Sequence, residues 1–278
     1  MTIKNMTHTA ALFYKSPNRT AVPLKWLERA SELFGEYRLS PILFTADGSG
    51  FVGDDCFILG PQDAEHVRWG ELLRARRSDL VEALRCQSVF SLHMDVPLTD
   101  AEDRAEWRAL ASTSSFSQEI VLGFNEDLVP DPASALRRAF RMAQDLFEIH
   151  YGFGYTMPLE DIPDCYASGI ARSTFNDFRE WLRQRSSGSL PPKSADEQWH
   201  DELCGEKRHL TGLFRGAYSA NLLSESHVQG ADLQAAGLGV LSDIGPSLWL
   251  WELSPTEIPQ AESWLETKGV LVRQHRPQ

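Results

Sequence analysis

The side chains best suited to chemistry gather in one polar segment of the C-terminal third. Glu197 and His200 are three residues apart, Cys204 follows His200 by four, and His209 lies nearby. A Glu-x-x-His pair on one helical face can ligate a metal in carboxylate bundles, but those sites need a second copy, which the sequence lacks. Cysteine and histidine four residues apart could act as nucleophile and base. Because no neighbouring residue type marks the thiol as activated, a solvated polar helix face is the preferred interpretation.

Common catalytic and cofactor-binding motifs are missing. The sequence contains no HExxH, GxSxG or P-loop pattern, and no GxGxxG that opens a helix. Residues 47–55 hold three glycines, but no GK[ST] follows and their aspartates would repel a phosphate. The Tyr-Gly-Phe-Gly-Tyr run at 151–155 is predicted to end a helix, so its N–H groups lack the field of a helix N-terminus. We therefore expect no catalytic residue, no metal and no cofactor.

Composition narrows the class of protein. The chain has 278 residues, 42% of them hydrophobic, and no apolar run approaches the ~20 residues of a membrane span. The first residues lack the apolar core of a secretory signal, and the four cysteines form no CxxC pair, so a cytoplasmic protein with reduced thiols is expected. The formal net charge of −12 disfavours nucleic-acid binding, which needs a basic surface.

Negative charge is concentrated in the middle of the chain. Residues 95–164 carry fourteen acids and five arginines, an excess of 14 − 5 = 9 negative charges. A solvated face is the ordinary explanation, and a surface complementary to a basic cleft is the functional one. The predicted partner-contacting residues are Asp100, Glu102, Asp103, Glu126, Asp127, Glu160, Asp161 and Asp164.

The helices that position the candidate side chains are predicted from hydrophobic periodicity. Asp131 and Pro132 suit the N-cap and first position of a helix, and apolar residues then recur at helical spacing through His150. We predict a long helix over 131–150 that passes into a glycine-aromatic turn ending at Pro158. Further helices are predicted at 23–37, 62–86, 99–111, 175–185, 196–203 and 254–269.

Period-two alternation and short apolar runs predict about seven strands. They lie at 10–14, 41–45, 88–94, 118–124, 237–243, 247–253 and 270–273, whereas 213–224 is expected to be a loop. Together these elements predict one α+β domain over 1–278, with a mixed or mostly antiparallel sheet of about seven strands and helices packed on it. The Gly-, Ser- and Pro-rich stretch 186–195 is a surface loop or a minor boundary.

Three segments together resemble a known group of proteins. They are the helix leading into Tyr-Gly-Phe-Gly-Tyr-Thr-Met-Pro at 151–158, the Asp-Ile-Gly-Pro-Ser-Leu-Trp-Leu-Trp-Glu-Leu run at 243–253, and the closing helix followed by Gly-Val-Leu-Val at 269–272. They resemble bacterial type VI secretion immunity families, including the immunity protein 52 family of polymorphic-toxin systems. The resemblance implies binding to a cognate effector toxin, typically a metal-dependent DNase of the restriction-endonuclease fold. These motifs are structural, so no binding residue carries over.

The sequence thus favours a cytoplasmic immunity protein that neutralises a nuclease effector by binding it, without catalysis of its own. Two alternatives stay open. One is a small-molecule enzyme using Cys204, His200 or His209 in a pocket near Tyr155. The other is a scaffold or adaptor that binds a non-toxin partner through its aromatic surface. No direct nucleic-acid or membrane partner is expected, and no oligomeric state is specified.

Overall fold

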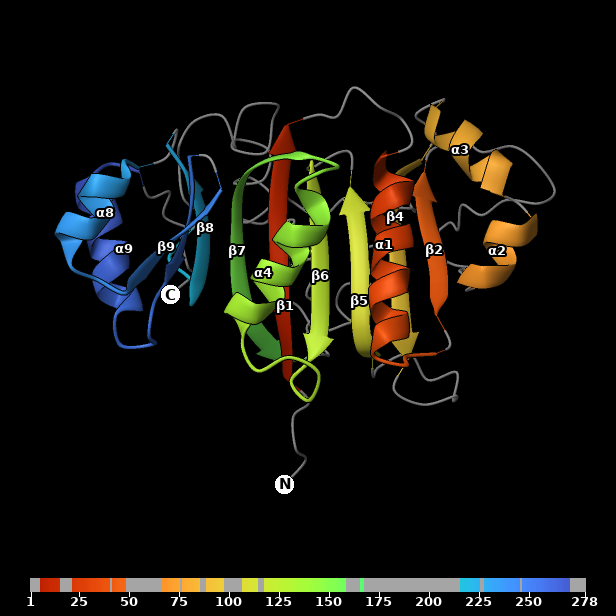
Figure 1. Ribbon diagram of the computed structural model, residues 1–278, viewed down its shortest axis with the longest axis horizontal. Coiled ribbons are helices and arrows are strands. Elements are labelled where there is room, and N and C mark those ends of the chain that lie inside the picture. Colours follow the sequence, from red (N-terminus) through yellow and green to blue (C-terminus); the bar gives the residue numbers. More distant parts are fainter. Residues whose placement is uncertain are drawn as a thin grey trace, which may run out of the picture.

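The computed structural model describes residues 6–15, 22–40, 42–48, 67–75, 77–85, 89–97, 107–114, 118–158, 166–167, 216–225, 228–245 and 247–270. Within these ranges the backbone forms one sheet with helices packed on it (Figure 1). The predicted α+β class is confirmed. The described part of the sheet has ten strands, more than the seven expected. They are β1 (Met6–Lys15), β2 (Leu43–Gly48), β3 (Val67–Arg68), β4 (Val89–Pro97), β5 (Trp107–Ser114), β6 (Glu119–Asn125), β7 (Glu148–Pro158), β8 (Ala220–Ser224), β9 (Val240–Gly245) and β10 (Leu248–Glu252).

The first strand of the chain lies near the centre of this sheet. The strand order is β3-β2-β4-β5-β6-β1-β7-β8-β10-β9, and neighbouring described strands pair antiparallel throughout. β1 pairs with β6 on one side and with β7 on the other, and both partners are distant in sequence. The sheet is therefore antiparallel, the second of the two predicted arrangements.

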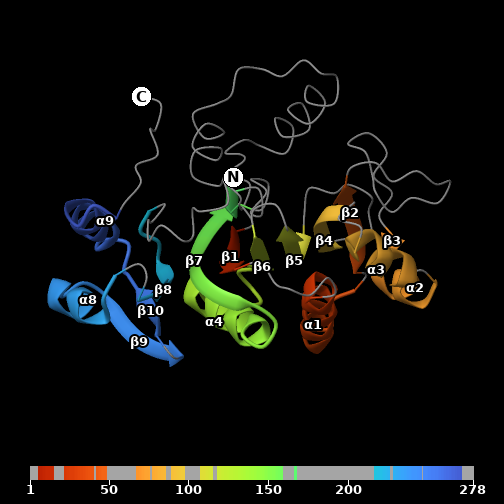
Figure 2. The same ribbon diagram turned by 90° about the horizontal axis from the view of Figure 1, so that it is seen from above.

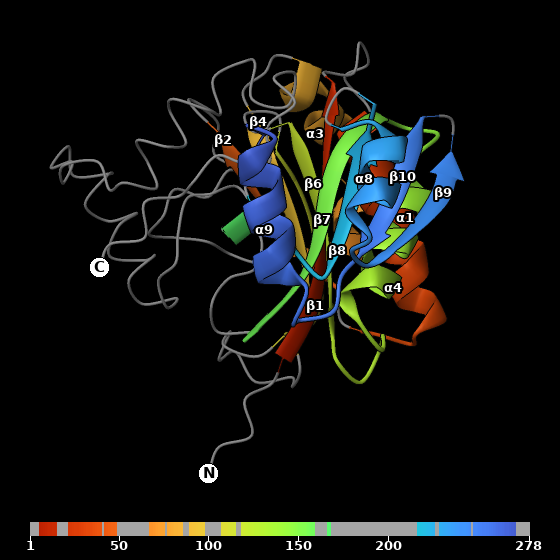
Figure 3. The ribbon, with the colours of Figure 1, turned by 90° about the vertical axis from the view of Figure 1, so that its left-hand side faces the viewer.

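Helices cover both faces, but at different ends of the sheet. α1 (Val22–Glu36) and α4 (Pro132–Ala143) lie side by side on one face, with α2 (Trp69–Ala75) and α3 (Arg77–Arg85) toward the β2–β3 end (Figure 2). α8 (Gly230–Ala236) lies at the β9–β10 end, together with α9 (Ile258–Thr267). α9 is on the opposite side of the sheet from α1 and α4 (Figure 3). Among the described residues, no helix is long and apolar enough to cross a membrane.

The central strands are buried on both faces because each face has its own apolar cover. Leu12 packs in the cluster beneath α1 and α4, whereas its neighbour Phe13 packs in the second cluster with Trp251 and Leu265. All seven residues of β6 are buried. This confirms the strand predicted at 118–124. Because both faces of the strand are covered, its sequence is almost continuously apolar and does not alternate with polar residues.

α1 confirms the helix predicted at 23–37. Leu24, Leu27 and Phe34 recur on its buried face. Trp26 adds a polar anchor, because its indole Nε1 donates to the Ser112 carbonyl of β5 over 3.0 Å. The helix is thereby fixed to the sheet by packing and by one buried hydrogen bond.

The long helix predicted over 131–150 is right at its start and wrong at its end. Asp131 is the N-cap, and its side chain accepts a 2.6 Å hydrogen bond from the Ser134 amide. α4 nevertheless stops at Ala143, and the Phe147 amide bonds back to the Ala143 carbonyl before β7 begins at Glu148. Residues 151–155 are therefore a central strand and not the predicted turn.

Close backbone approach explains the glycines of β7. Its aromatic side chains Tyr151, Phe153 and Tyr155 face the second cluster, which leaves Gly152 and Gly154 on the side of α4. A Cβ on Gly154 would lie 2.6 Å from the Pro132 carbonyl oxygen, and one on Gly152 would lie 2.8 Å from a β1 carbonyl. A glycine inside a strand marks such an approach as well as a turn.

Several other predicted boundaries are corrected. Residues 107–111, predicted as the end of a helix, belong to β5, where Leu110 faces one cluster and its neighbours Ala109 and Ala111 face the other. The expected loop 213–224 contains β8, four of whose five residues are buried. The predicted helix 62–86 comprises β3, α2 and α3, and α8 was not predicted.

The C-terminal unit keeps the predicted order of two strands and a helix, but β9 begins at Val240 and not at 237, and α9 begins at Ile258 and not at 254. Ser254 and Glu257 close the turn before α9, with both the amide and the hydroxyl of Ser254 donating to the Glu257 carboxylate. These bonds lower the pKa of Glu257. Gly269, at φ 70°, follows the C-cap as expected, and β10 is flanked by β8 and β9. The elements predicted at 175–185, 186–195, 196–203 and 271–273 lie outside the described residues.

Candidate functional site

Two of the eight predicted partner-contacting acids fall within the described chain. Glu126 and Asp127 are exposed in the turn between β6 and α4. The Glu126 amide donates to the Met6 carbonyl over 3.1 Å and to the Asn125 side-chain oxygen over 2.8 Å, so the turn is fixed to the start of β1. The other six, Asp100, Glu102, Asp103, Glu160, Asp161 and Asp164, lie outside the described residues.

We call Glu126, Asp127 and Asp131 the acidic corner. Asp127 is paired with Arg108 over 2.9 Å, and Asp131 caps α4. The carboxylate of Glu126 makes no ion pair within the described ranges. Burial lowers the pKa of nearby His8, and the charges of Asp131 and Glu126 oppose that shift. The corner is thus an exposed turn that is held by hydrogen bonds and carries excess negative charge.

A pocket of about 680 Å³ opens at the other end of β1, where β7 and β8 separate. We call it the fork pocket. Described pairing between these strands is confined to Gly152–Gly154 opposite Ala220–Leu222, while β8 stays paired with β10 as far as Ser224. β7 also carries a bulge, since Phe13 pairs with Tyr151 but Tyr14 pairs with Ile149, leaving His150 between them. A bulge bends its strand, and this one lies next to the point where the described pairing of β7 with β8 ends.

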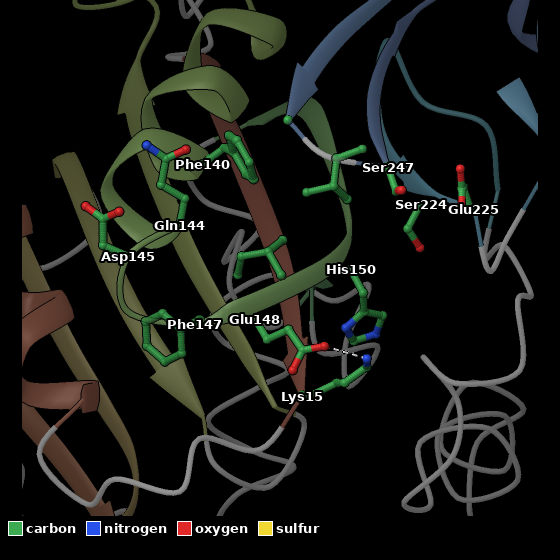
Figure 4. A pocket seen from close by; sticks show the side chains of 13 residues that line it. Lys15, Phe140, Gln144, Asp145, Phe147, Glu148, His150, Ser224, Glu225 and Ser247 are labelled. Atoms are coloured by element: carbon green, nitrogen blue, oxygen red, sulfur yellow. Dashed lines mark hydrogen bonds and ion pairs between the residues drawn. The ribbon is translucent and has the colours of Figure 1, made fainter.

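The floor of the fork pocket is apolar and comes from three elements. Phe140 belongs to α4, Phe147 and Ile149 flank the start of β7, and Leu248 opens β10 (Figure 4). Phe147 packs against Tyr14, and the centroids of the two rings are 4.5 Å apart. The floor therefore rests on the main core and is formed before any ligand arrives.

The walls of the fork pocket carry more negative than positive charge. Lys15 and Glu148 form a 2.5 Å ion pair, shown dashed in Figure 4. Asp145 lies 3.8 Å from Arg29, and Glu225 has no ion pair in the part of the chain that the structure describes. The three lining carboxylates thus face two cations, Lys15 and the neighbouring Arg29, which leaves an excess of 3 − 2 = 1 negative charge, that of Glu225.

The C-terminal end of α4 forms one wall. Arg29 of α1 donates to the Met142 carbonyl over 2.6 Å, which holds the last turn of the helix in place. Gln144 and Asp145 follow directly and line the pocket. The partial negative charge of this helix C-terminus is met by the Arg29 guanidinium.

His150 is a functional candidate that sequence reasoning missed. It lines the pocket but is only 6% exposed, and burial, reinforced by the positive charge of Lys15, lowers its pKa to about 4, with Glu148 opposing. The imidazole is therefore neutral at pH 7. The sequence placed His150 on a helical stripe, and no local signal marks a bulge at this residue.

The groups named for the enzyme alternative are not described by the structure. Glu197, His200, Cys204 and His209 all lie outside the described residues. Among the residues that are described, no three His, Cys, Asp or Glu side chains gather as a metal site would require. The fork pocket combines an apolar floor with charged walls.

Comparison with known proteins identifies a shared fold. No protein-family model matches the chain, and no curated protein matches it. The chain is similar to the solved structure of Pseudomonas aeruginosa T6SS protein PA0821, with a TM-score of 0.50 and 11% sequence identity. The match covers 98% of this chain and 76% of that one. At this identity the likeness shows that the two chains share an overall fold.

Proposed function

We propose that this chain acts in type VI secretion as an immunity protein that binds a nuclease effector and neutralises it. The observation that carries the proposal is the fold likeness to a T6SS protein over 98% of the chain. The immunity role itself is suggested by the resemblance of three sequence segments to type VI immunity families, whereas no family model matches the chain.

Charge supports a nuclease as the partner. A DNA-cleaving enzyme needs a basic cleft to bind phosphates, and this chain has a net charge of −12. The acidic corner presents part of that charge on a turn already fixed by hydrogen bonds to β1. A preformed surface loses little conformational freedom on binding, and opposite charges raise the association rate.

The direct test uses the effector encoded beside this chain. The two purified proteins should form a stable complex, and increasing amounts of this chain should stop cleavage of plasmid DNA by the effector at a one-to-one ratio. Absence of a complex at micromolar concentrations, measured by calorimetry, would reject the proposal.

A second experiment separates electrostatic steering from binding as such. The double variant Glu126→Gln/Asp127→Asn should lower the association rate several-fold at low salt and leave the dissociation rate nearly unchanged. The control Glu32→Gln/Glu36→Gln removes the same charge from exposed positions of α1. Equal association rates for the two variants would show that the acidic corner has no special part, while leaving the immunity function intact.

A further inference from the structure

The fork pocket combines two properties that select one kind of ligand. Its floor is formed by Phe140, Phe147, Ile149 and Leu248, and its walls carry one excess negative charge, on Glu225. A ligand that suits both has an apolar stem and a cationic head. Long basic side chains have this form, since they bury their methylene groups on apolar surfaces while the charged end meets carboxylates.

We propose that the fork pocket receives one arginine side chain from a loop of the effector, an inference that rests on the proposed function. The volume of about 680 Å³ lies in the range of roughly 300–1,000 Å³ that is typical of small-ligand sites. It therefore accommodates a loop tip with its anchoring side chain. Arginine is also among the residues most often found at the energetic centre of protein interfaces.

The residues around the pocket favour a guanidinium over other groups. Asp145 and Glu225 lie on opposite sides of the pocket (Figure 4), and Glu225 is the lining carboxylate without an ion pair among the described residues. A planar guanidinium can bond to a carboxylate while stacking on an aromatic ring such as Phe140. An anion would meet the excess negative charge. Lys15 does not offset that charge freely, because it is held by Glu148.

Charge complementarity points to the effector as the source of the arginine. The cleft of a DNA-cleaving enzyme is lined with basic residues that contact phosphates. The pocket and the acidic corner lie at opposite ends of β1, so a partner that reaches both would span the length of the central strand. Occupation of the pocket would then add a specific anchor to the steering provided by the corner.

The first test measures the dissociation rate of the effector complex. Asp145→Asn/Glu225→Gln should raise it about 10- to 100-fold and change the association rate much less. Ser224→Arg, which places a guanidinium from this chain at the pocket wall, should have a similar effect. The matched controls are Glu32→Gln/Glu36→Gln for lost charge and Gln260→Arg, an exposed α9 position that does not line the pocket, for gained charge.

The second test needs no effector. N-acetyl-arginine amide, titrated into the wild-type chain at millimolar concentrations, should shift amide NMR signals around Phe147 and Leu248. The neutral isostere N-acetyl-citrulline amide should not, and Ser224→Arg should abolish the arginine response. Equal responses to both probes, or none to either, would overturn the assignment of a guanidinium site.

The two tests distinguish a failure of the pocket proposal from a failure of the proposed function. A wild-type complex whose dissociation rate is unchanged by the pocket variants retains the immunity function and rejects the pocket as its anchor. Failure of the wild-type complex to form rejects the immunity function, and the probe titration then decides alone whether the pocket binds arginine. Unfolding midpoints equal to wild type confirm that each variant is folded.

Discussion

Replacing Gly154 by alanine adds one methyl group where β7 passes beneath the first turn of α4. The new Cβ would lie 2.6 Å from the Pro132 carbonyl oxygen, whereas ordinary contact begins at 3.4 Å, so the two must separate by 3.4 − 2.6 = 0.8 Å. The carbonyl belongs to backbone and cannot rotate away like a side chain. It is also held by the Asp131 cap and by the packing of Leu136 and Phe140.

We expect Gly154→Ala to lower the free energy of unfolding by about 3 kcal/mol, at the upper end of the usual cost of overpacking. Urea unfolding followed by tryptophan fluorescence measures the change. The matched control is Gly35→Ala in α1, where a Cβ would meet nothing within 4 Å. It should raise the free energy of unfolding by about 0.5–1 kcal/mol, because alanine favours the helix.

The refuting result is a Gly154→Ala protein within about 0.5 kcal/mol of wild type. Residues 151–155 would then tolerate a side chain, as an exposed turn would. The contact between β7 and α4 would then not require glycine at position 154.

Three further outcomes follow from the same structure. Asp131→Ala should cost about 1 kcal/mol in urea unfolding and Asp131→Asn much less, since asparagine also caps a helix. Trp26→Phe should cost roughly 1–3 kcal/mol, because the buried Ser112 carbonyl loses its indole donor, and an unchanged unfolding midpoint would contradict this. The folded-state pKa of His150 is about 4, below its ordinary 6.5, so the unfolded chain binds the extra proton. Stability should therefore fall by at most about 3 kcal/mol as pH drops from 6.5 to 4, and His150→Gln should lack that part of the slope.

Sequence patterns predicted elements well where local and tertiary preferences agree. The strand at 118–124 could be identified because its side chains are apolar almost without interruption, and α1 because its stripe has one period throughout. The start of α4 was predictable because an N-cap is a local device, with Asp131 bonding to an amide three residues away.

Predictions failed where distant segments decide the structure. Phe147 and His150 extend the helical period of α4, but β1 pairs with this stretch and takes it into the sheet. Gly152 and Gly154 look like turn residues unless the close approach of β1 to Gly152 and of α4 to Gly154 is known. The fork pocket was not predictable, because it depends on where β7 and β8 separate and on a bulge that only the pairing with β1 defines.

The position of β1 has a consequence for synthesis of the chain. The strand ends at Lys15, yet its first partner, β6, begins at Glu119, which is 119 − 15 = 104 residues later. At about 5–20 residues per second, the ribosome needs roughly 5–20 s to make that intervening stretch. During this interval an apolar strand with both edges open has neither of its native neighbours. Such strands pair readily with other chains, so early shielding of β1 should raise the yield of folded protein.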